Sequence, residues 1–179
     1  MVVSNLLVCA LLGASPNPHS VLAYQTVDAI LHSKQPDEPK TKTPSKGVFV
    51  TIESDGKVVG CRGTLQPSEA TLELEIQKAA RSAAQFDPRY HQVQIGKKAF
   101  AVTVTIVERL ESIATVDNLE PKDGLVLRSS KGVGVVLPWE GRDAKTRLEW
   151  AYKKAGTTQG TSVTLNRLIA ERFRYPEPK

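Results

Sequence analysis

The sequence predicts an α+β domain whose sheet is mainly antiparallel and flanked by helices, with a small N-terminal lobe. Extended and helical patterns are mixed without the β-α-β alternation of parallel sheets, and hairpin signals join neighbouring strands. The 179 residues, 40% of them hydrophobic, suit a single domain with a sizeable core. We expect residues 15–46 to form an N-terminal helix and connector, residues 47–175 the body, and residues 176–179 a tail.

The first residues have the outline of a secretory signal peptide. Residues 6–14 are apolar, end in small residues and are followed by Ser-Pro-Asn-Pro. No Lys or Arg precedes them, so a cytosolic chain with a coincidental apolar start is the alternative. We treat residues 1–14 as a candidate signal peptide and favour an exported or periplasmic protein over a cytoplasmic one. No apolar run reaches the ~18 residues that span a bilayer, so no membrane span is expected.

The first half of the chain contains a clear hairpin signal between two helical patterns. Apolar residues alternate on both sides of Asp55-Gly56, a dipeptide typical of tight hairpin turns. The helical patterns repeat apolar residues every three to four positions. The expected elements are a helix over residues 20–33 that packs on the body, a connector over 37–44, strands over 47–53 and 57–64, and a helix from Pro67 and Ser68 to Gln85.

The second half is expected to add most of the sheet. Its clearest strand alternates Phe100, Val102, Val104 and Ile106 with short residues, which indicates a central position. A later helix is amphipathic and ends at Gly156, a typical C-terminal cap. The expected elements are a strand over residues 99–107, a hairpin of strands 124–128 and 133–137, a helix over 145–155, an edge strand over 162–165 and a frayed tail from Tyr175.

Cys61 is the candidate catalytic residue. A thiol becomes nucleophilic where a nearby cation or helix N-terminus lowers its pKa. The helix expected to begin near Ser68 could supply that potential, whereas Arg62 points to the opposite face of an extended strand. The alternative is that Cys61 is a small, inert core residue, which is the commoner role of a free cysteine. Neither Cys9 with Cys61 nor the three dispersed histidines has metal-ligand spacing, so no metal or cofactor is predicted.

Gly60, Gly63 and Thr64 are candidate ligand-binding residues around that cysteine. Two glycines in one short strand indicate a bulge or a close backbone approach. They would either admit a ligand's carbonyl or phosphate to backbone amides, or relieve crowding where a helix crosses the sheet. Thr64 would either face a ligand or cap the following helix.

Asp87 and Arg89 are the remaining candidate binding residues, together with Arg62. After the helix end they would either pair with each other, the commoner outcome, or orient a carboxylate or phosphate through the arginine fork. His91 is expected to be a solvated loop residue. Trp139-Glu140 would either wall a pocket or pack in the core, and core packing is the simpler interpretation.

Several short motifs occur in the order found in AMMECR domains, and the chain resembles that family over residues 20–175. The family's hallmark strand reads R-G-C-I-G-T or close to it, where this chain has VVGCRGT. Here Val59 replaces the hallmark arginine, and Arg62 follows Cys61 in place of an aliphatic residue. The other matching segments are GVFVT and DGK before that strand, then D-P-R-Y at 87–90, D-G-L-V-L at 123–127, G-V-V-L-P at 134–138 and K-K-A-G at 153–156.

The resemblance implies an antiparallel sheet flanked by helices, with the Gly-Cys strand lining a cleft. It also implies a functional link to Memo-like and radical-SAM proteins, the AmmeMemoRadiSam system, but no particular reaction. Two functions stay open. One is a small-molecule enzyme or ligand-binding domain with a cleft around the Gly-Cys-Arg-Gly strand. The other is a non-catalytic adaptor that presents the same hairpin to a protein partner.

Nucleic acid is not an expected partner. The net charge is +5, but the basic residues are dispersed among acidic ones, and no aromatic stacking pattern accompanies them. A mildly basic, well-solvated surface accounts for that charge.

Overall fold

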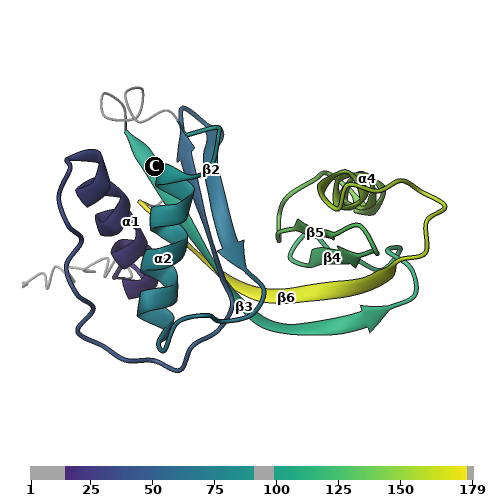
Figure 1. The fold of residues 1–179 in the computed structure, drawn as a ribbon, viewed down its shortest axis with the longest axis horizontal. Coiled ribbons are helices and arrows are strands. Elements are labelled where there is room, and N and C mark those ends of the chain that lie inside the picture. Colours follow the sequence, from purple (N-terminus) through teal and green to yellow (C-terminus); the bar gives the residue numbers. More distant parts are fainter. Residues whose placement is uncertain (1–14, 91–98, 177–179) are drawn as a thin grey trace, which may run out of the picture.

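The computed structural model describes residues 15–90 and 99–176 (Figure 1). The candidate signal peptide and His91 lie outside the described residues. Within residues 15–90 and 99–176, no helix combines the length and the apolar character that crossing a bilayer requires. The elements are α1 (Pro18–Leu31), β1 (Val48–Ser54), β2 (Lys57–Thr64), α2 (Leu72–Gln85), β3 (Phe100–Ile113), β4 (Gly124–Arg128), β5 (Val133–Val136), α4 (Ala144–Lys154) and β6 (Thr164–Tyr175).

The strands form one curled antiparallel sheet in the order β2-β1-β3-β6-β4-β5. The protein is therefore an α+β domain, as the sequence predicts. The long strands β3 and β6 run side by side through the whole molecule and connect two lobes (Figure 1). The first lobe contains α1, α2, β1 and β2, and the second contains β4, β5 and α4 (Figure 1).

The core of the first lobe lies between the two helices and one face of the sheet. Buried residues of α1 and α2, among them Val27 and Ile76, pack on Val50 of β1 and Val104 of β3. The helix expected to mark a small N-terminal lobe thus belongs to the helical layer of this larger lobe. The opposite face of the same strands carries no helix (Figure 1), and this determines where a site can form.

The second lobe has a separate core beneath α4, built around Leu125, Leu127 and Ala151. Gly134 of β5 allows the helix to approach closely, because a Cβ atom there would lie 1.9 Å from the carbonyl oxygen of Ala151. The predicted hairpin of β4 and β5 and the predicted α4 are confirmed. Gly156 adopts φ +65° after the helix, as expected of its C-terminal cap.

The turn Asp55-Gly56 is confirmed, with φ values of 52° and 70° that fit a tight hairpin. The expected start of α2 is wrong, because Thr71 rather than Ser68 caps the helix. The backbone N–H groups of Ser68 and Glu69 instead donate to the Glu75 carboxylate, which holds this segment outside the helix.

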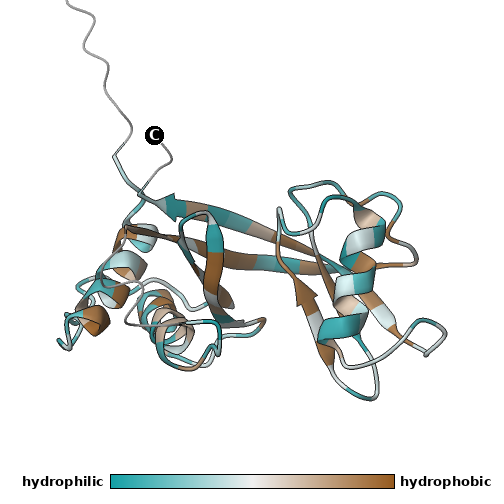
Figure 2. Ribbon diagram, turned by 90° about the horizontal axis from the view of Figure 1, so that it is seen from above, coloured by the Kyte–Doolittle hydropathy of each residue, from teal (hydrophilic) through white to brown (hydrophobic). Residues whose placement is uncertain are grey.

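The largest error concerns the C-terminus. Residues 162–165 were expected to form a short edge strand, and residues 166–174 were assigned to no element. The structure has the 12-residue strand β6 there, and it lies between β3 and β4. Its charged residues are interspersed with apolar ones, and the partners of those charges lie far away in sequence. In the fold Arg174 pairs with Glu53, and Arg167 lies near Asp123. The hydrophilic end of β6 lies beside the apolar β3 in Figure 2.

Glu73 ties the connector to α2, and we expect it to make stability depend on pH. Its buried carboxylate accepts hydrogen bonds from the backbone and hydroxyl of Thr43 and from the hydroxyl of Thr41. Burial alone would raise the pKa of Glu73, but these bonds outweigh it and bring the pKa to about 2. Because the folded-state pKa is depressed, the stabilisation is complete above the unfolded-state value near 4.3 and is lost as the pH falls toward 2.

The Glu73→Gln variant should therefore lose on the order of 3 kcal/mol at neutral pH, and its stability should differ less from wild type as the pH falls. Urea denaturation at a series of pH values measures both effects. Glu69→Gln is the control. The Glu69 carboxylate pairs with the exposed Lys78, so this variant should cost under about 1 kcal/mol. A pH-independent difference between Glu73→Gln and wild type would contradict the assignment.

Candidate functional site

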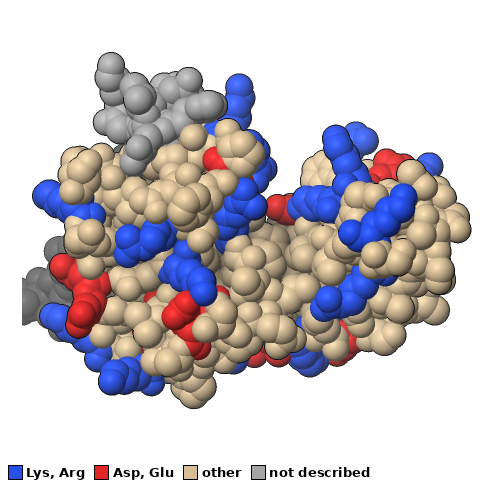
Figure 3. Space-filling view, in the orientation of Figure 1, with Lys and Arg blue, Asp and Glu red and all other residues tan. Residues whose placement is uncertain are grey.

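A cleft separates the two lobes on the face of the sheet that no helix covers. It contains two adjoining cavities of about 470 Å³ and 280 Å³, which share Arg89, Leu137, Glu140 and Lys154 in their walls. Figure 3 shows the hollow between the lobes with Lys and Arg side chains on both of its sides. The larger volume lies within the range of roughly 300–1,000 Å³ typical of small-molecule sites.

The strand register places two rows of residues, most of them polar, across the floor of this cleft. Cys61, Thr51, Thr103 and Arg174 are cross-strand partners on β2, β1, β3 and β6. The next row is Gly63, Phe49, Thr105 and Arg172. Since side chains alternate between faces, both rows point away from α1 and α2. The hydroxyl of Thr103 is buried and has no hydrogen-bond partner among the described residues.

Cys61 lies on the cleft face, where burial disfavours its thiolate form. Burial raises the pKa of its thiol, and the hydrogen bond that the Thr51 hydroxyl donates over 3.3 Å opposes this only in part. The expected helix N-terminus is not its neighbour. The strand instead passes the C-terminal end of α2, where Gly60 approaches the carbonyl of Ala83. Arg89 and Lys154 lower the pKa of the thiol, but burial outweighs them.

We expect alkylation of Cys61 to be slow at neutral pH and to titrate above the ordinary thiol pKa of about 8.5. The rate of iodoacetamide labelling of the Cys61 peptide, followed by mass spectrometry over a pH series, measures this. The urea-unfolded protein is the control and should titrate near the ordinary value. Rapid labelling of the folded protein well below that value would show an activated thiol and contradict the burial argument.

The two glycines of the hallmark strand satisfy packing requirements. A Cβ atom on Gly60 would lie 2.5 Å from the carbonyl oxygen of Ala83 in α2, which is the crowding expected where a helix crosses the sheet. A Cβ atom on Gly63 would lie 2.1 Å from the carbonyl oxygen of Val48 in β1. The extra residue of the expected bulge is Val59, where the β1–β2 register shifts.

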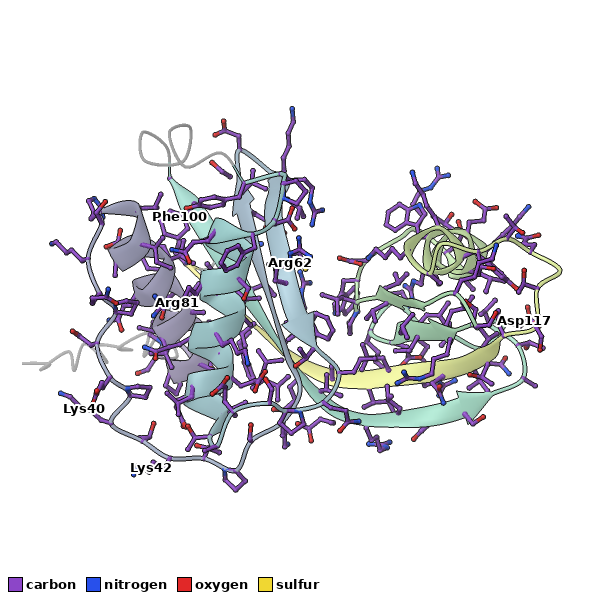
Figure 4. All side chains as sticks on the ribbon, viewed as in Figure 1. Lys40, Lys42, Arg62, Arg81, Phe100 and Asp117 are labelled. Carbon is purple, nitrogen blue, oxygen red and sulfur yellow. The ribbon has the colours of Figure 1, made fainter. Side chains whose placement is uncertain are left out.

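Arg62 and Thr64 lie on the other face of β2 from Cys61. The Arg62 guanidinium donates a hydrogen bond to the carbonyl of Phe86 over 2.7 Å, at the end of α2 (Figure 4). The Thr64 hydroxyl lies within hydrogen-bond distance of Gln66 and Glu75, and it does not cap α2. Arg62 still borders the smaller cavity, whereas Thr64 borders neither.

Asp87 and Arg89 pair with each other and brace the hallmark strand. The buried Asp87 carboxylate accepts hydrogen bonds from the backbone N–H of Cys61 and from the backbone and side chain of Arg89. Burial alone would raise the pKa of Asp87, but these donors hold it well below its usual range. The partly exposed Arg89 also lines both cavities.

The second lobe contributes cleft residues that the sequence analysis did not bring together with Cys61. Trp139 and Trp150 are exposed and line the larger cavity, so Trp139 walls the cleft and does not pack in the core. Trp139 has φ 66°, which is unusual for a residue other than glycine and typical of strained functional segments. The Glu140 carboxylate holds this turn, since it accepts hydrogen bonds from the backbone of Leu137 and from Lys154.

Thr105 and Arg172 complete the floor of the larger cavity. The sequence offered a signal for Thr105, because threonines occupy alternate positions of an otherwise apolar strand. Arg172 was assigned to no element that would place it in a site, because β6 was expected to end earlier.

The fold and the site together define a class of protein: an α+β domain in which two lobes share one antiparallel sheet and enclose a cleft. A sequence model of the AMMECR1 family matches residues 20–176, and the chain belongs to that family.

Relatives in bacteria and archaea extend over most of the chain. A Thermotoga maritima protein is 29% identical over 170 residues, covering 88% of this chain and 98% of that protein. A Methanococcoides burtonii protein is 29% identical over 86% of this chain and 84% of its own length. A Clostridium acetobutylicum protein is 30% identical over 72% of this chain, but the match spans only 28% of that longer protein.

A solved structure shows the same fold. The crystal structure of an uncharacterized protein from Pyrococcus horikoshii matches with a TM-score of 0.72 at 23% identity, covering 89% of this chain and 91% of that one.

Proposed function

We propose that this protein binds a small molecule in the cleft between its lobes, and that Cys61 shapes the floor of the site without acting as a nucleophile. The observation that carries the proposal is the position of the tryptophans. The chain has two, and both expose their indoles to the larger cavity. Exposed indoles are costly unless a ligand covers them, and the left-handed turn at Trp139 is a strained way to present one.

The other walls suit a bound ligand. Apolar contacts come from Val58, Leu137 and Pro138, while Thr51, Thr105 and Arg172 provide polar groups on the floor. A few convergent polar groups in a partly apolar hollow are typical of small-molecule sites. The raised pKa of the Cys61 thiol favours binding over thiol catalysis.

Tryptophan fluorescence provides a direct test, since its signal comes entirely from the cleft. The protein should be titrated with a library of small metabolites, and at least some compounds should change the emission saturably at one-to-one stoichiometry. The Val58→Tyr variant narrows the mouth of the cavity and should weaken these ligands. Leu74→Tyr, at an equally exposed position on α2 outside the cleft, should not. A library without a saturating ligand, or ligands unaffected by Val58→Tyr, would contradict the proposal.

A second function is favoured by the apolar surface around the cleft. Val58, Phe86 and Val133 are exposed, and two of them border the cavities. Such side chains at the rim would suit a protein partner, which is the adaptor alternative. The link to Memo-like and radical-SAM proteins stays a prediction from family resemblance. An adaptor would bind no metabolite, and the Phe86→Ser variant would lose the protein partner. A ligand-binding domain would still bind its ligand in that variant.

A further inference from the structure

Arg172 differs from the other cations around the cleft. Its side chain forms no hydrogen bond and no ion pair with any described residue, although it lies on the cleft floor among charged groups. The others have partners: Arg89 pairs with Asp87, Lys154 with Glu140, Arg174 with Glu53, and Arg62 donates to the Phe86 carbonyl.

The carboxylates nearest Arg172 are engaged with other cations. Partial desolvation by the cleft walls lowers the pKa of Arg172, and the neighbouring Arg174 acts in the same direction. Glu53 and Glu140 oppose this effect, but each of them forms its own ion pair with Arg174 or Lys154. Because Arg172 is exposed to the cleft and no carboxylate among the described residues pairs with it, its guanidinium is available to bind an anion.

Neutral groups beside Arg172 indicate what else the ligand carries. Thr105 is its cross-strand partner on β3 and lines the same cavity, so a hydroxyl is available next to the guanidinium. Trp139 and Trp150 line that cavity too, and indole faces stack well on flat unsaturated rings. The cavity of about 470 Å³ can accommodate a ring together with a small charged group.

We propose that the ligand of the cleft joins an oxyanion, a carboxylate or a phosphate, to a flat unsaturated ring. Arg172 binds the oxyanion and the two indoles contact the ring. This inference rests on the proposed small-molecule function and names its ligand class. The planar guanidinium fork matches both oxyanions with two parallel hydrogen bonds, which a lysine at this position would not reproduce.

Four simple probes test the ligand class. Phenyl phosphate and benzoate carry the two oxyanions, and benzyl alcohol and benzamide are their uncharged counterparts. Binding is measured by calorimetry and by tryptophan emission at low and high salt. At least one anion should bind about tenfold or more tightly than its uncharged counterpart, because hydrogen bonds to charged groups are the stronger ones. The preferred anion distinguishes a carboxylate ligand from a phosphate ligand.

Two arginine variants assign the effect to a residue. Arg172→Gln should reduce binding of the preferred anion to the level of the uncharged probe. Arg172→Lys should bind that anion more tightly than Arg172→Gln but less tightly than wild type. Arg128→Gln removes the same charge from an exposed arginine at the end of β4, outside the cavity lining, and should leave binding unchanged. Circular dichroism and thermal melting confirm that each variant is folded.

The outcomes separate this inference from the proposed function. Equal binding of charged and uncharged probes, or anion binding that Arg172→Gln leaves intact, would overturn the ligand class while the cleft remained a binding site. Failure of all four probes, when metabolites from the library do bind in the cleft, would overturn the ligand class alone. Failure of the probes and of the whole library would overturn both.

Discussion

Replacing Gly63 with alanine is expected to destabilise the protein by about 3 kcal/mol or more, which lowers the melting temperature by roughly 10 °C. The added Cβ atom would lie 2.1 Å from the carbonyl oxygen of Val48 and 2.5 Å from the Cα atom of Phe49. Both are backbone atoms of the paired strand β1, so neither can move without separating β1 from β2. Thermal melting followed by circular dichroism measures the loss.

The control for this variant lies in the same hairpin. Gly56 has φ +70° and no atom within 4 Å of an added Cβ, so Gly56→Asn should cost only about 1 kcal/mol. If Gly63→Ala kept wild-type stability but lost ligand binding, the packing account of this glycine would be wrong. Gly63 would then admit a ligand to the backbone.

Asp87→Ala is expected to destabilise the protein by about 3 kcal/mol. The carboxylate is the acceptor for the backbone N–H of Cys61 on the edge strand β2 and for the backbone N–H of Arg89. Its removal leaves these donors without their charged partner, and hydrogen bonds to charged groups contribute about 1.5–3 kcal/mol each. Chemical denaturation measures the change in the free energy of unfolding.

Arg89→Ala separates the ion pair from the backbone contacts. The Arg89 side chain is 54% exposed, so its ion pair should contribute under about 1 kcal/mol. Asp87→Asn keeps one oxygen acceptor and should fall between the alanine variant and wild type. If Arg89→Ala were as damaging as Asp87→Ala, the ion pair rather than the Cys61 contact would stabilise this loop.

The sequence predicted the elements whose signals are local. The Asp55-Gly56 turn has the backbone angles that its residue types favour, and the buried residues of α2 and β3 follow the expected periodicities. The pairing of Asp87 with Arg89 was also predictable, because the two residues are close in sequence. The direction in which the pKa of the Cys61 thiol shifts was not predictable, since it depends on burial and on which end of α2 lies nearby.

The cleft itself is a product of long-range pairing. Arg172 faces the cavity only because β6 inserts between β3 and β4, and Trp139 reaches the same cavity from a turn after β5. No spacing in the sequence connects these residues with Thr51 or Thr105. The full length of the strand over residues 164–175 could not be predicted, because the partners of its charged residues, Glu53 and Asp123, lie far away in sequence.

The most direct test of the small-molecule cleft is an NMR titration of the two indole N–H signals. The chain has two tryptophans, so each signal reports on one wall of the larger cavity. A ligand found by fluorescence should shift both signals saturably with the same dissociation constant, and Val58→Tyr should weaken both shifts together. Unchanged indole signals, with ligand-dependent shifts confined to the cavity beside α1 that Leu22, Lys34 and Gln77 line, would contradict the account.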